Sequence, residues 1–264
     1  MHPILFTLGP LTIYTYGVMM VTAFLAGTWL AAHAAEALPA QVRAISADQM
    51  LDFTSLSLLA GLAGGRLLYI FLQWRFFLEA PLEVFALWHG GLVWYGGFLG
   101  GMLGAWFYTR ASRLSYLRVM DQFIPFLALG HAIGRVGCFL NGCCYGRPTT
   151  AWCGVTFPGQ MKAVLPTQLF EATGLFFLYI ALRLLQRPAM LRAPGRVLGA
   201  YLMGYAALRF ALEYSRGDQA IWWMGLTLAQ LISVAAGLLG VVLLVRPGPS
   251  PTTAGAGPGR HVRV

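Results

Sequence analysis

The sequence predicts an all-α integral membrane protein with about seven transmembrane helices. Of its 264 residues, 58% are hydrophobic and only 10% are charged, whereas soluble domains carry roughly 25% charged residues. The mean hydropathy is +0.67. Apolar runs of about 18 residues, each long enough to cross a hydrocarbon core of about 30 Å, recur along the whole chain.

The apolar runs place the predicted helices in order along the chain, at 14–34, 51–72, 92–108, 119–133, 167–185, 197–214 and 224–245. No basic segment of the kind that opens a cleavable signal peptide precedes the first run, so we expect it to stay in the membrane. The fourth run is short and is interrupted by Pro125. We expect residues 1–246 to form one transmembrane domain. The Pro-, Gly- and Ala-rich segment 247–264 is expected to be a disordered tail.

The basic residues predict the orientation of the helices. With the N-terminus outside, eleven Lys and Arg residues fall in inner loops and the tail, and five fall on the outer side. This bias favours an outer N-terminus and an inner C-terminus. The net charge of +9 does not indicate nucleic-acid binding, because most basic residues occupy short loops between apolar runs and no basic stripe lies on a soluble face.

Glycines recur every four positions in the third predicted helix, at Gly96, Gly97, Gly100, Gly101 and Gly104. Small residues at this spacing share one helical face and let a neighbouring backbone approach closely. We therefore expect this helix to pack tightly against another.

Ionisable residues within predicted spans are the first candidates for function, because a charge inside a bilayer is costly. Arg66 lies near the outer end of the second span, where a structural arginine that snorkels to the interface is the alternative. Arg209, Glu213 and Arg216 are spaced i, i+4 and i+7, so they share one face of the sixth helix. A purely structural ion pair is the alternative there.

The least membrane-like segment between two predicted spans is 134–148, which holds Arg135, Asn141 and four glycines. Glycine permits backbone shapes that other residues resist, and arginine offers a planar fork that grips phosphate oxygens. We expect a loop that dips against the helix bundle and binds an anionic headgroup. An ordinary connecting loop is the alternative.

All four cysteines, Cys138, Cys143, Cys144 and Cys153, belong to this outer region. Disulfides that staple the loop are the expected state on an oxidising face. The spacing C-x4-C-C-x8-C is not a standard zinc pattern. Metal binding, thiol catalysis and simple packing of the cysteines remain as alternatives.

Several motifs together resemble the bacterial prolipoprotein diacylglyceryl transferase family over residues 8–244. The matching motifs are Tyr14-Thr15-Tyr16-Gly17, Gly64-Gly65-Arg66 with Tyr69, Gly90-Gly91 with Tyr95-Gly96-Gly97, the 134–146 signature, Pro166-Thr167-Gln168-Leu169-Phe170-Glu171, and Arg209-Phe210 with Glu213 and Arg216. No single motif would suffice, but their order and spacing make a specific signal.

The resemblance implies a multi-pass enzyme of the bacterial inner membrane, with a periplasmic N-terminus and a cytoplasmic C-terminus. It would transfer the diacylglyceryl group of phosphatidylglycerol to the lipobox cysteine of a preprolipoprotein signal peptide and release glycerol phosphate. Its implied partners are this lipid, this peptide and the bilayer, without nucleic acid, cofactor or metal. The implied catalytic residues are Arg135, Arg209 and Tyr95, and the implied substrate-binding residues are Arg135, Arg209, Tyr16, Arg66, Asn141, Gly146, Glu213 and Arg216.

The sequence departs from the family pattern at several positions, so other functions remain as alternatives. Tyr95 stands where many members have a histidine proposed as the base, Cys138 and Cys143 replace the usual Asn and Glu, and Leu165 replaces a histidine. An inactive member that binds an anionic lipid or peptide and a membrane thiol oxidoreductase are therefore alternatives. A transporter is disfavoured, because the ionisable residues cluster at one face and no inverted repeat is visible.

Overall fold

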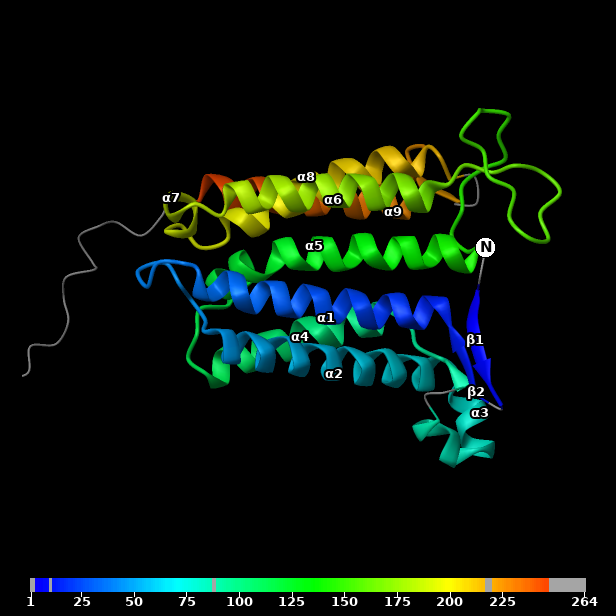
Figure 1. Ribbon diagram of the computed structural model, residues 1–264, viewed down its shortest axis with the longest axis horizontal. Coiled ribbons are helices and arrows are strands. Elements are labelled where there is room, and N and C mark those ends of the chain that lie inside the picture. Colours follow the sequence, from blue (N-terminus) through cyan, green and yellow to red (C-terminus); the bar gives the residue numbers. More distant parts are fainter. Residues whose placement is uncertain (1–2, 10, 87–88, 217–219, 247–264) are drawn as a thin grey trace, which may run out of the picture.

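The computed structural model describes residues 3–9, 11–86, 89–216 and 220–246 and consists of long helices that run side by side (Figure 1). The long helices are α1 (Thr15–Glu36), α2 (Ala47–Leu72), α4 (Trp94–Ala111), α5 (Tyr116–Asn141), α6 (Thr167–Leu185), α8 (Arg196–Glu213) and α9 (Leu228–Val245). Among the described residues, five helices are long and apolar enough to cross a membrane: α1, α2, α5, α6 and α9. An all-α membrane protein is thus confirmed at this level. The predicted tail 247–264 lies outside the described residues.

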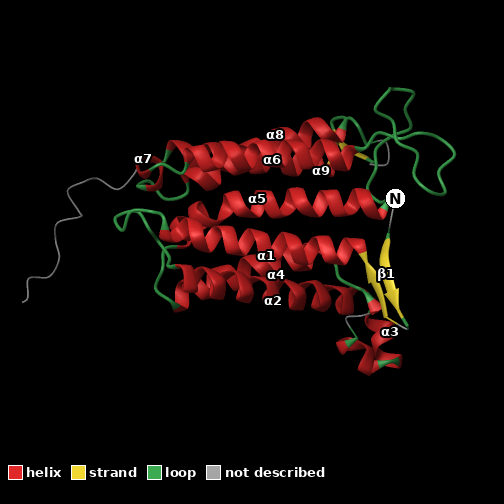
Figure 2. Cartoon of the chain, viewed as in Figure 1, coloured by secondary structure: helices red, strands yellow, loops and turns green. Residues whose placement is uncertain are grey.

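Short elements cap the two ends of the bundle (Figure 2). At one end lie the antiparallel hairpin of β1 (Ile4–Leu8) and β2 (Leu11–Tyr14), α3 (Trp74–Glu79), the 3-10 helix η1 (Pro81–Phe85), the 142–166 loop, and the hairpin of β3 (Ile221–Trp223) and β4 (Leu226–Thr227). We call this the hairpin end. The short helix α7 (Pro188–Leu191) lies at the opposite end. These strands were not predicted from the sequence.

Helix α5 occupies the centre of the bundle, because it packs against α1 on one side and against α6 and α8 on the other (Figure 1). Apolar side chains fill both contacts. Phe53 and Phe126 belong to the cluster on the α1 side, and Ile124 and Leu175 belong to the cluster on the α6 side. The helix that carries the sequence signature is therefore held from both sides.

Helices α2 and α4 approach each other through glycines, as the small-residue pattern predicts. A Cβ atom on Gly64 would lie 2.5 Å from the carbonyl oxygen of Gly96 and 2.9 Å from the Cα of Gly100. No side chain other than hydrogen fits at such a distance. The glycine repeat of α4 therefore brings two backbones into direct contact.

The first half of the predicted signature loop is helical, which corrects the expectation for 134–148. Helix α5 does not end near 133 but continues to Asn141, with Pro125 inside it. Its glycines serve packing rather than turning, since a Cβ on Gly137 would lie 2.9 Å from the Cβ of Met19 on α1. Gly142 caps the helix, and its φ of 76° is the left-handed conformation that glycine adopts readily.

A buried carboxylate fixes α8 relative to α5 at the end opposite the hairpins. Asp121 accepts hydrogen bonds from the backbone N–H groups of Gly195 (2.6 Å) and Leu198 (2.8 Å) at the start of α8. An anionic side chain is favourable at a helix N-terminus, where backbone N–H groups lack partners. This contact anchors the helix that carries Arg209.

Candidate active site

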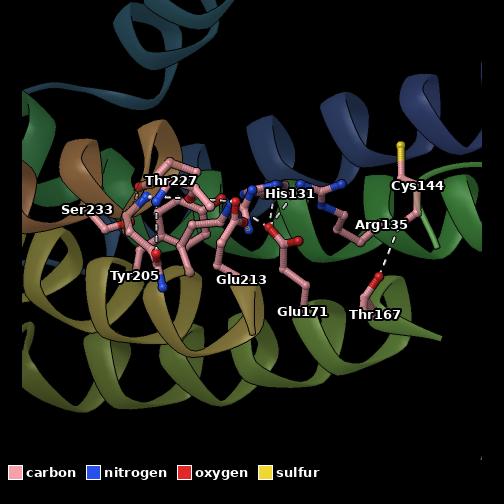
Figure 3. Close-up of polar contacts among 12 residues, drawn as sticks. His131, Arg135, Cys144, Thr167, Glu171, Tyr205, Glu213, Thr227 and Ser233 are labelled. Carbon is pink, nitrogen blue, oxygen red and sulfur yellow. Dashed lines mark hydrogen bonds and ion pairs between the residues drawn. The ribbon is translucent and has the colours of Figure 1, made fainter. Parts of the chain in front are cut away.

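Glu171 on α6 is the centre of a buried polar cluster near the hairpin end (Figure 3). One of its carboxylate oxygens, Oε1, lies 3.0 Å from Nη2 of Arg135 and 3.6 Å from Nε2 of His131, both on α5. The same oxygen accepts a hydrogen bond of 3.0 Å from the hydroxyl of Tyr205 on α8. The Glu171 side chain is only 5% exposed. A single carboxylate thus joins three helices.

A second ion pair lies on α8. Nη1 of Arg209 is 2.6 Å from Oε2 of Glu213, one helical turn further along. The other oxygen of Glu213 accepts a hydrogen bond of 2.7 Å from the hydroxyl of Thr227, which caps the N-terminus of α9. The i, i+4 pairing predicted from the sequence is present, and it ties α8 to α9.

The two arginines occupy the same end of neighbouring helices. Arg135 lies six residues before the last residue of α5, and Arg209 lies four residues before the last residue of α8. The charges of both arginines act on the imidazole of His131. Both guanidinium groups therefore lie near His131, close to the hairpin end.

One part of these guanidinium groups is buried without a hydrogen-bond acceptor in the described part of the chain, namely Nε of Arg135. Nη1 of Arg209, by contrast, is paired with the carboxylate of Glu213. A buried donor without an acceptor is costly. An anionic oxygen that entered this region would satisfy Nε of Arg135, so the arrangement is suited to binding a phosphate group.

The Pro-Thr-Gln motif at the start of α6 holds the turn that follows α5. The hydroxyl of Thr167 donates a hydrogen bond of 3.0 Å to the carbonyl of Cys144, and the amide of Gln168 donates one of 2.6 Å to the carbonyl of Cys143. The Thr167–Cys144 contact is drawn in Figure 3. The motif therefore has a clear local function, which is to fix the backbone of the signature turn.

Gly146 lets the signature pass close to the end of α8. A Cβ atom there would lie 2.5 Å from the carbonyl oxygen of Ser215 and 2.6 Å from a methyl carbon of Thr167. Its own N–H group donates to the carbonyl of Leu165 at 2.8 Å. This predicted site residue is thus required where three segments meet.

All four cysteines lie in the described part of the chain and are free thiols, which corrects the expectation of a disulfide-stapled loop. The Sγ atoms of Cys143 and Cys144 are 3.7 Å apart, far beyond the S–S bond of about 2.05 Å. Hydrogen bonding with Cys138 lowers the pKa of Cys144 to about 5, and the charges of Arg135 and Arg216 act in the same direction. Burial raises the pKa of Cys143.

Three further predicted residues lie beside the signature. The ring of Tyr16 at the start of α1 would be 3.4 Å from a Cβ on Gly137, and its hydroxyl interacts electrostatically with Arg135. Asn141 is the last residue of α5, and its side chain hydrogen-bonds with Cys143. Arg216 follows the end of α8, and its charge reaches Cys144.

Arg66 is separate from this cluster and is bound by main-chain oxygens. Its guanidinium group donates to the carbonyls of Val84 (3.1 Å), Gly90 (2.5 Å) and Gly91 (3.2 Å) and also to those of Glu83 and Ala86. The side chain therefore organises the segment between α3 and α4. Its donors already have protein acceptors, unlike Nε of Arg135.

Tyr95 lies in the first turn of α4, is 55% exposed and packs its ring against Trp94. Within the described residues, no hydrogen bond or ion pair joins it to the arginine cluster. The structure thus brings Arg135, Arg209 and Glu213 together. Arg66 on α2 and Tyr95 on α4 lie apart from them.

Three residues of the cluster were missing from the predicted site, namely His131, Glu171 and Tyr205. Glu171 was visible as the last residue of a motif, but its pairing with Arg135 depends on helix packing. His131 lies four residues before Arg135 and Tyr205 four residues before Arg209, so each shares a helical face with an arginine. This spacing is the signal that could have found them.

Comparison with known proteins gives a match over nearly the whole chain. The family model described as prolipoprotein diacylglyceryl transferase matches residues 3–246. A phosphatidylglycerol–prolipoprotein diacylglyceryl transferase of Dechloromonas aromatica is 36% identical over 252 residues, which cover 92% of this chain and 94% of that protein. One with the same name from Cupriavidus pinatubonensis is 33% identical over 250 residues, covering 92% and 90%.

Proposed function

Because the chain belongs to the prolipoprotein diacylglyceryl transferase family, we propose that the cluster of Arg135, Arg209 and Glu171 is its active site. The protein transfers the diacylglyceryl group of phosphatidylglycerol to a prolipoprotein during lipoprotein maturation. The observation that carries the proposed site is the pair of arginines on neighbouring helices, of which Arg135 has a buried Nε without a hydrogen-bond acceptor in the described part of the chain. The lipid phosphate supplies this acceptor.

The chemistry requires such a site. The sulfur of the prolipoprotein cysteine attacks a glycerol carbon of the lipid, a C–S bond forms, and the C–O bond to the phosphate breaks. Negative charge therefore grows on the departing glycerol phosphate, and fixed cations in a water-poor site stabilise it. The same positive field favours the thiolate, which is the nucleophilic form of the cysteine.

Glu171 and Glu213 act as positioning residues in this proposal. Each holds one guanidinium group, so that Arg135 and Arg209 keep their orientation before the lipid arrives. Arg216 adds a positive charge next to the signature turn, where it acts on Cys144.

The other predicted residues receive supporting roles. Tyr16 and Asn141 line the signature from α1 and from the end of α5, and Gly146 permits the contact with α8. Arg66 shapes the outer segment that leads to Tyr95. Tyr95 is exposed at the hairpin end and is proposed as a hydrogen-bond donor to an incoming substrate.

We also propose the membrane topology. Helices α4 and α8 have 18 residues each and lie within the same bundle as the five apolar helices, so residues 1–246 form one domain with seven spans. The charge bias supports a periplasmic N-terminus and a cytoplasmic C-terminus in the bacterial inner membrane. The hairpin end then faces the periplasm, where the lipobox cysteine of the preprolipoprotein signal peptide reaches it and glycerol phosphate is released.

The experiment compares arginine variants in a transferase assay with phosphatidylglycerol vesicles and a lipobox peptide. We expect Arg135→Gln and Arg209→Gln each to lower kcat by roughly 10²- to 10³-fold, the usual effect of losing one fixed donor to a developing charge. Arg75→Gln is the matched control, because Arg75 is exposed and stacks on Trp74. Near-normal activity of both variants would exclude the proposed phosphate site, and loss of activity with Cys143→Ser alone would favour thiol redox chemistry.

A further inference from the structure

Three cysteines near the hairpin end bring their sulfur atoms together. The Sγ atoms of Cys138, Cys143 and Cys144 all lie within 4.8 Å of one another. Cys138 is a buried residue of the last turns of α5, Cys143 is half-buried and Cys144 is exposed. The group therefore has an inner and an outer side, and an ion could reach it from the surface.

The backbone that carries these sulfurs is fixed on every side. Gly142 turns the chain in the left-handed conformation, and the N–H group of Cys143 donates to the carbonyl of Cys138 at 3.1 Å. Cys144 itself has a φ of 63°, a backbone conformation that is rare for residues other than glycine. With the carbonyls of Cys143 and Cys144 held from α6, the three thiols are preorganised.

The spacing of the sulfurs suits a shared ion better than a pairwise bond. Metal–sulfur bonds are about 2.3 Å long, so three sulfurs arranged in a plane around one ion lie about 4.0 Å apart. The observed limit of 4.8 Å needs only a small adjustment to reach this value. A disulfide would use two of the thiols and leave the third without a role.

The ligand set indicates which ion fits. Among the described residues, the group contains three thiols and no imidazole or carboxylate. Structural zinc sites are almost always four-coordinate, whereas soft thiolate ligands also select Cu(I). Three thiolates carry excess negative charge, which the nearby guanidinium groups of Arg135 and Arg216 offset.

We propose that Cys138, Cys143 and Cys144 form a three-sulfur binding site for Cu(I). The site lies beside the Arg135 cluster but shares none of its ligands with it. Metal binding can therefore be measured separately from transferase activity.

The test is an anaerobic titration of the reduced full-length protein in detergent with Cu(I), in competition with a coloured Cu(I) chelator. We expect one Cu(I) per chain, with a sulfur-to-metal absorption band in the ultraviolet. Cys144→Ser removes an exposed ligand and should weaken binding by more than the roughly 10- to 100-fold that a lost outer-shell partner costs. Cys153→Ser is the matched control and should bind like the wild type, because Cys153 is outside the group.

Two outcomes would overturn the proposal. Zn(II) that displaces Cu(I) would indicate a four-ligand site, and equal losses in Cys144→Ser and Cys153→Ser would indicate nonspecific thiol binding. Cys138→Ser, which changes a buried residue, is interpreted only if its thermal unfolding matches that of Cys144→Ser.

Discussion

Replacement of Gly64 by alanine tests the contact between α2 and α4. The new Cβ would lie 2.5 Å from the carbonyl oxygen of Gly96, whereas ordinary contact begins at 3.4 Å. The two backbones must therefore separate by about 0.9 Å, the difference between these distances. Overpacking of this kind costs about 1–3 kcal/mol, and the better helix propensity of alanine returns up to about 1 kcal/mol. We expect net destabilisation of about 1–2 kcal/mol.

Gly101→Ala is the matched control for this change. A Cβ on Gly101 meets only the carbonyl oxygen of Ser57, at 3.5 Å, so the helix-propensity gain should stabilise the protein by up to about 1 kcal/mol. Thermal unfolding of both purified variants in the same detergent measures the difference. The expected gap corresponds to a melting temperature lower by several degrees for Gly64→Ala, at roughly 2–4 °C per kcal/mol. Shifts of the same sign in both variants would refute the close backbone contact.

Further predictions concern individual side chains. Glu171→Leu should destabilise the protein by about 3–5 kcal/mol, because it leaves the buried charge of Arg135 without its partner. Glu171→Gln keeps a hydrogen-bond acceptor and should destabilise the protein less. Equal melting temperatures for the two variants would contradict this prediction. Iodoacetamide should alkylate Cys144 in the metal-free protein well below pH 8, because hydrogen bonding with Cys138 lowers the pKa of Cys144 to about 5 and the thiolate persists above that pH. Peptide mass spectrometry follows this rate, and a midpoint above pH 8 would contradict it. Arg66→Lys should expose the segment between α3 and α4 to proteolysis, because an ammonium group has only three donors for five carbonyl oxygens. A cleavage rate equal to that of the wild type would argue against the role of Arg66 in organising this segment.

Most of the helical framework could be predicted from the sequence, because long apolar runs leave few alternatives to helix inside a bilayer. The helix 167–185 was predicted with the bounds that the structure has. The end of α5 was missed, because its glycines and polar residues resemble a loop when the neighbouring helix is unknown. The terminal hairpins were missed because strands of two to five residues at helix ends carry no periodic signal.

The candidate site was predictable where it follows spacing within one helix and unpredictable where it depends on packing between helices. The Arg209–Glu213 pair follows from its i, i+4 spacing. The Arg135–Glu171 pair joins α5 to α6, so it becomes visible only once their register is known. The carbonyl oxygens around Arg66 come from an irregular segment, and no side-chain pattern encodes them.

The carboxylate shared by three helices has a consequence for biosynthesis. Arg135 is translated before Glu171, which lies on the next long helix of the chain, and Tyr205 follows on the one after that. When α5 enters the bilayer, Glu171 has not yet been synthesised, so Arg135 has no acidic partner. An unpaired charge in hydrocarbon is costly. Helices α5 and α6 are therefore expected to leave the translocon together as a pair, and α8 joins this pair afterwards.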